Sequence, residues 1–112
     1  MRQKLKNAYC LEMDEAIRFY KLNELDSAFH HLERAHILAQ NYTIPHTKSH
    51  WWMLKVGVKQ HNFREVFGQI TRIIASVLFS KIWVPTGNTG RANVNPLKPM
   101  AIPEDLKTVL SK

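Results

Sequence analysis

The chain has 112 residues, the length of one domain, with 45% hydrophobic and 22% charged residues. This is ordinary globular composition, so it excludes a disordered chain and a collagen-like repeat. Sixteen Lys and Arg against nine Asp and Glu give a net charge of +7. The basic residues are dispersed and do not alternate with aromatic residues, which favours a solvated basic surface over a nucleic-acid site.

The single cysteine, Cys10, cannot form an intrachain disulfide and indicates a reducing compartment. Residues 1–6 are charged and no apolar run follows them, so no secretory signal is expected. The uncharged apolar stretch at residues 73–80 is far shorter than a membrane span. These features predict a cytoplasmic protein without a membrane segment.

Helical spacing of apolar residues predicts four helices, at about residues 2–22, 24–40, 45–60 and 62–82. Asn23 ends the first of them, and Asn62 with Glu65 forms a capping-box pair that begins the fourth. Because the connections are short, the predicted fold is all-α, an antiparallel four-helix bundle over residues 2–83. The fourth helix has a broad apolar face and brings no inward acid; that face comprises Phe63, Val66, Phe67, Ile70, Ile73, Ile74, Val77 and Leu78.

The composition changes after Trp83, because four of the five prolines lie in the last quarter of the chain. Proline at this density prevents a regular helix, so residues 84–102 are interpreted as an extended Pro/Gly-rich strap lying on the bundle. Pro103, followed by two acids, begins a short final helix. Strap and final helix (residues 84–112) complete one helical domain over residues 1–112.

Polar residues on the inward helix faces form the candidate site: Glu12, Glu33, His36, His46 and His50. Spacings of three (Glu33, His36) and four (His46, His50) place side chains on one helix face, where a pair can hold one ion. The pattern indicates a mononuclear site of two or three histidines and one carboxylate, Glu12 or Glu33. Such ligands suit zinc, iron, nickel or copper. The leading hypothesis is therefore a small metal-binding protein for sequestration, sensing or delivery, and an open coordination position would permit catalysis.

The alternative hypothesis is a non-catalytic protein-interaction module. Residues 19–35 resemble one tetratricopeptide unit, and no second copy follows at the expected period. In that case the histidines and acids form a structural network, for example between Glu12 and His36. One of the adjacent Trp51 and Trp52 packs inward, and the other covers the strap or contacts a protein partner. The candidate partners are thus a metal ion, a protein and, in a homodimer, a second copy of the chain.

The glycine-containing loop at residues 84–94 is a weaker candidate site. Gly-rich turns can direct backbone N–H groups at an anion, but the segment lacks the Gly-Lys-Ser/Thr of a phosphate-binding loop. Gly87 and Gly90 are interpreted as turn residues, and the role of residues 86–90 stays open.

Four sequence motifs together resemble a small bacterial family of unknown function: FHHLERAHIL (29–38), HWWML (50–54), VPTGNTG (84–90) and PMAIP (99–103). The resemblance covers most of the chain. It implies relatives encoded near heavy-metal-resistance genes, which agrees with the metal hypothesis. It assigns no activity and no functional residue.

Overall fold

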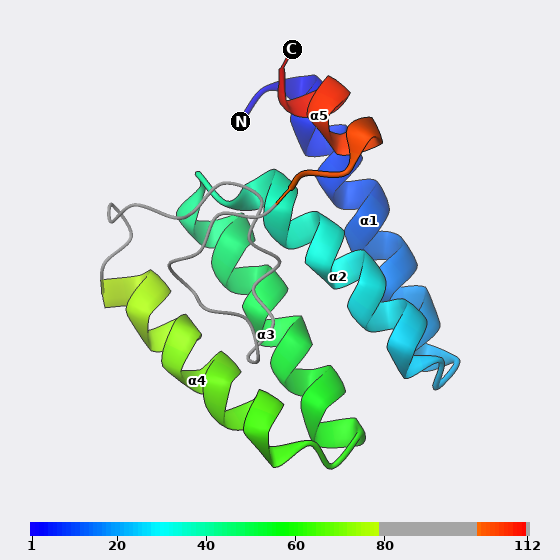
Figure 1. Ribbon diagram of the computed structural model, residues 1–112, viewed down its shortest axis with the longest axis vertical. Helices are drawn as coiled ribbons and strands as arrows, with labels where there is room; N and C mark the ends of the chain where they lie inside the picture. Colours follow the sequence, from blue (N-terminus) through cyan, green and yellow to red (C-terminus); the bar gives the residue numbers. More distant parts are fainter. Residues whose placement is uncertain (79–100, 112) are drawn as a thin grey trace.

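The computed structural model describes residues 1–78 and 101–111, without the side chains of residues 76 and 77. This part of the chain contains helices and no strand (Figure 1), which confirms the all-α prediction. The helices are α1 (Gln3–Lys21), α2 (Leu25–Ala39), α3 (Thr43–Lys59), α4 (Phe63–Leu78) and α5 (Glu104–Leu110). Most of the predicted strap, including the loop at residues 86–90, lies outside the described residues.

The helix boundaries follow the local signals in the sequence. Asn23 and His61 have φ values of 61° and 55°, the left-handed conformation that ends α1 and α3. The Asn62 side chain then accepts a hydrogen bond of 3.1 Å from the backbone N–H of Glu65, as an N-cap does. α3 begins at Thr43, two residues earlier than predicted, because Pro45 lies in the first turn, where no backbone N–H needs a helical partner.

The four long helices pack in chain order, α1 on α2, α2 on α3 and α3 on α4 (Figure 1). α2 therefore lies between two neighbours and contributes the most buried residues of the core. Ala28 and Ala35 are fully buried there, because their small side chains allow close helix approach. Phe29 and Leu32 fill the adjoining space and supply the apolar surface that stabilises the hairpins.

α4 is oriented differently from the sequence-based expectation. Its apolar stripe is exposed; the exposed members are Phe63, Phe67, Ile70, Ile74 and Leu78. The face toward α3 carries the buried polar residues Glu65 and Gln69. A Cβ atom added at Gly57 of α3 would lie 3.3 Å from Val66 and 3.4 Å from Glu65, so the glycine permits the close approach of these two helices.

The final helix joins the two ends of the described chain. Leu106 of α5 is buried against the core, and α5 packs on α1 and α2. The Arg2 guanidinium donates a hydrogen bond of 2.8 Å to the carbonyl of Val109, so the N- and C-termini lie together (Figure 1). Pro103 and the acids Glu104 and Asp105 begin this helix, as the sequence predicted. Among the described residues, no helix has the length and apolar character needed to cross a bilayer.

Candidate metal centre

Three histidines from two helices meet inside the α2–α3 hairpin. His36 lies in the last turn of α2, and His46 and His50 lie one turn apart on α3. Residues at similar distances before and after the turn of an antiparallel hairpin face each other, so the short connection at residues 40–42 brings His36 opposite His46. The potential ligand atoms of the three rings all lie within 4.8 Å of one another, a group that could hold a metal ion.

The three rings form a nearly equilateral cluster, with centroid separations of 4.6, 4.7 and 4.7 Å. The Nε2 atom of His46 lies 2.8 Å from that of His36 and 3.2 Å from that of His50. Nitrogens bound at tetrahedral zinc are about 3.3 Å apart, given bond lengths near 2.0–2.1 Å. These two pairs therefore need to separate by at most about 0.5 Å for both of their members to bind one tetrahedral ion.

Burial keeps the imidazoles of His46 and His50 neutral. His36 and His50 are each 2% exposed, and His46 is half-buried. Burial lowers the pKa of His46 to about 4. Burial also lowers the pKa of His50 to about 3, with a smaller effect from the positive charge that His46 carries when protonated. At neutral pH both rings are thus in the form that binds a metal.

A hydrogen-bonded chain from α4 fixes the tautomer of His50. Gln69 donates a hydrogen bond of 2.5 Å from Nε2 to the Glu65 carboxylate, which orients the amide so that Oε1 faces the imidazole. The Nδ1 atom of His50 lies 2.6 Å from that oxygen and must carry the proton it donates. The lone pair of His50 is therefore on Nε2, the nitrogen that points into the cluster.

Glu65 corrects the prediction that the fourth helix brings no inward acid. This carboxylate is 4% exposed and lies behind Gln69, on the far side of the amide from His50. Arg72 is a nearby positive charge whose pKa burial lowers and Glu65 raises. The histidine cluster thus has a carboxylate behind its ligands, as metal-binding histidines commonly do.

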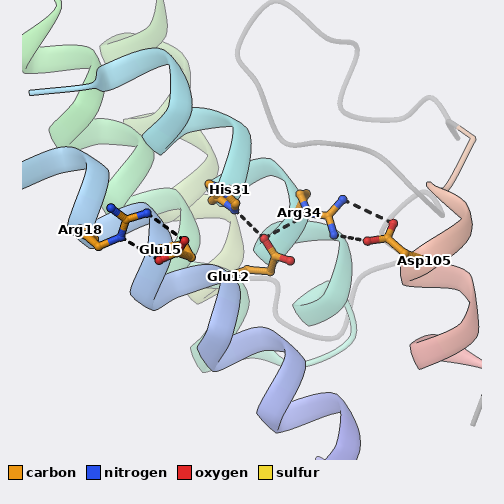
Figure 2. Close-up of polar contacts among 6 residues, drawn as sticks. All are labelled: Glu12, Glu15, Arg18, His31, Arg34 and Asp105. Atoms are coloured by element: carbon orange, nitrogen blue, oxygen red, sulfur yellow. Dashed lines mark hydrogen bonds and ion pairs between the residues drawn. The ribbon is translucent and has the colours of Figure 1, made fainter. Parts of the chain in front are cut away.

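The two predicted carboxylate ligands lie outside the three-histidine group. Glu12 of α1 lies 2.8 Å from Nδ1 of His31 and 3.1 Å from Nε of Arg34 (Figure 2). Arg34 also pairs with Asp105, so these contacts join α1, α2 and α5. Glu33 lies half-buried on α2. Glu12 therefore lies in a network that links helices.

Trp52 is the more buried of the two adjacent tryptophans. Its ring meets Tyr20 edge to face at a centroid distance of 5.4 Å, and it packs against the core. Trp51 is exposed. The prediction that the two rings face different surroundings therefore agrees with their burial.

Comparison with known proteins identifies the family. A family model described as "Protein of unknown function (DUF3703)" matches residues 3–110. The chain belongs to this family. Searches of curated proteins and of solved structures found no match.

Because the DUF3703 description names no activity, function has to be inferred from the geometry of this chain. In this DUF3703 protein, the three histidines are predicted from the sequence as site residues, whereas Gln69 and Glu65 are not. A usable signal exists, because Glu65 and Gln69 are four residues apart and lie opposite the apolar stripe of their helix. An amide and an acid sharing a helix face can form such a chain behind a buried histidine.

Proposed function

We propose that this DUF3703 protein binds one transition-metal ion through His36, His46 and His50. The observation that carries the proposal is the convergence of three imidazoles, two of them buried, within ligand distance of one another. Neutral imidazole nitrogens suit zinc, copper, nickel and iron. Three protein ligands leave a fourth position for water or a small ligand, as in catalytic zinc sites.

The surroundings of the cluster support a site prepared for a cation. The Nδ1–H group of His50 donates its hydrogen bond to Gln69, so the lone pair on Nε2 already points into the cluster. No ring rotation is therefore needed before binding. Glu65 supplies a negative charge close to the ligands. Outer partners of this kind orient metal-bound histidines and raise their basicity.

The burial of the cluster favours retention of the ion over rapid exchange, so the proposed use is sequestration, with sensing and delivery as the alternatives. A cytoplasmic location fits the free thiol of Cys10, which is exposed. The sequence predicts Glu12 or Glu33 as a carboxylate ligand. In the proposed site the carboxylate is instead Glu65, which lies behind the histidine ligands.

The test is metal analysis of protein purified without a histidine tag. We expect about one transition-metal ion per chain, or binding of added Zn²⁺, Cu²⁺ or Ni²⁺ to the metal-free protein at micromolar concentration or below, seen by calorimetry. Because a ligand that binds the native state stabilises it, the melting temperature should rise with the bound metal.

Single substitutions separate the cluster from other histidines. His36→Gln, His46→Gln and His50→Gln should each weaken binding at least tenfold while helical content is retained. His30→Gln is the matched control, because His30 is exposed on the same helix as His36. A purely structural histidine network would show no retained metal and no thermal shift with any added ion, and this result would refute the proposal.

A further inference from the structure

The strongest feature outside the metal site is the exposed apolar stripe of α4. Phe63 and Phe67 are 78% and 77% exposed, and Leu78 is 67% exposed; Ile70 and Ile74 lie between them on the same helix. Monomeric proteins rarely leave apolar patches of more than a few hundred Å² in water. The stripe therefore marks a contact surface.

The spacing of the stripe is that of a helix–helix seam. Phe63, Phe67, Ile70 and Ile74 are separated by four, three and four residues, the alternation that a and d positions show in a coiled coil. Such a seam accepts knobs from one facing helix. The partner that it fits is thus a second helix with the same narrow apolar stripe.

The opposite face of α4 is already occupied. Glu65 and Gln69 are buried toward α3, and the chain from Gln69 to His50 fixes the rotation of α4 about its axis. The helix cannot turn its apolar stripe inward without breaking these hydrogen bonds. The stripe must therefore be covered from outside the α3–α4 hairpin.

We propose that α4 forms the interface of a homodimer, in which this stripe packs against the same stripe of a second copy. A two-fold axis makes one patch its own complement, so no second surface is required. The five side chains are 44% to 78% exposed. At about 150–250 Å² for a large aromatic side chain, the stripe offers about 600 Å² per copy. Two copies would bury about 1,200 Å², the lower end of the range for stable interfaces.

The charges near the seam permit this contact. Within α4, Arg64 is the exposed charged residue, because Glu65 is buried and Arg72 is half-buried. The net charge of +7 on each copy opposes association at long range. Salt screens that repulsion and leaves the apolar contact in place, so the dimer should become tighter as ionic strength rises.

Analytical ultracentrifugation of the full chain tests the proposal. The expected sedimenting species has twice the chain mass at micromolar concentration, and its dissociation constant should fall with added salt. Phe67→Glu should convert it to a monomer with unchanged helical circular dichroism, because this side chain makes its main contact across the dimer. Leu11→Glu, at another strongly exposed apolar position, on α1, should leave the dimer intact.

Cross-linking gives a second readout, which detects the dimer directly and does not depend on a substitution that disrupts it. Ile70 lies at the middle of the stripe, so Ile70→Cys in a Cys10→Ser background should form an interchain disulfide under mild oxidation. Leu11→Cys in the same background should not. A wild-type monomer at all concentrations tested, or a dimer that Phe67→Glu leaves unchanged, would refute the proposal and would indicate another occupant for the stripe.

Discussion

The Nδ1 atom of His50 lies 2.6 Å from Oε1 of Gln69, which joins α3 to α4 behind the histidine cluster. This contact makes α4 part of the candidate metal centre although none of its residues belongs to the three-histidine group. It also relates the metal site to the proposed interface, because the same helix carries Gln69 on one face and the apolar stripe on the other.

Gln69→Leu should weaken metal binding by roughly 10- to 100-fold, the usual effect of removing a partner behind a histidine ligand. The change leaves His50 free to place its proton on either nitrogen. Competition titration with a chromophoric chelator measures the affinity. In the metal-free protein, nitrogen-15 NMR should show one tautomer of His50 for the wild type and a mixture for the variant.

Gln60→Leu is the matched control, because the Gln60 amide donates its hydrogen bond to Asp26. It should alter neither the affinity nor the tautomer. If His50 keeps a single tautomer in Gln69→Leu, the positioning role of Gln69 is wrong even if the three histidines bind metal.

The metal-free protein should lose stability on mild acidification. Burial lowers the pKa of His46 to about 4 and that of His50 to about 3, whereas in the unfolded chain both are near 6.5. The unfolded state therefore binds protons first, so the stability contributed by the neutral rings is complete above about pH 6.5 and declines as the pH falls toward 4. The slope approaches about 1.4 kcal/mol per pH unit for each histidine.

Urea unfolding of the metal-free protein between about pH 7 and pH 5 measures this decline, in a range where most carboxylates stay ionised. The groups in contact with the two rings are His36 from α2 and Gln69 from α4. Two charged groups of α4 lie nearby: Glu65 behind Gln69, and Arg72, whose charge lowers the pKa of His50. His50→Gln removes one of the titrating rings and should make the decline shallower. An equally steep decline in that variant would exclude His50 as a source of it.

Glu12→Gln should reduce the free energy of unfolding by about 1.5–3 kcal/mol, the range for hydrogen bonds to a charged group. The reason is that Glu12 contacts both His31 and Arg34, and Arg34 in turn pairs with Asp105 on the final helix. Metal stoichiometry and affinity should not change. Denaturant unfolding and metal titration of the same preparation distinguish this structural role from a ligand role, which would appear as loss of metal.

Leu32→Ala should cost about 2–5 kcal/mol, because a fully buried leucine leaves a cavity when truncated. Leu11→Ala makes the same chemical change at an exposed position of α1 and should cost less than about 0.5 kcal/mol. Chemical denaturation measures both. Similar losses for the two variants would contradict the burial of Leu32 in the core.

The histidine cluster shows what a single sequence can reveal about a site. His46 and His50 share a helix face because they are four residues apart, and a short connection to the preceding helix brings His36 close. The helical spacing also places Glu12 on an inward face, and so predicts that it shares the interior with the histidines. Its position in space depends on the rotation of α1 against α2, and this rotation turns the acid toward His31 and Arg34.

Local sequence features are enough to predict the all-α class, the capping of α4 by Asn62 and the grouping of the three histidines, because helical periodicity and cap chemistry are local properties. Which face of α4 is buried depends on its packing against α3. An amphipathic pattern identifies two faces of a helix but assigns neither to the interior, and the polar face of α4 is buried because Gln69 and Glu65 find hydrogen-bond partners there. The apolar face is left exposed because α4 packs on α3 through its polar face.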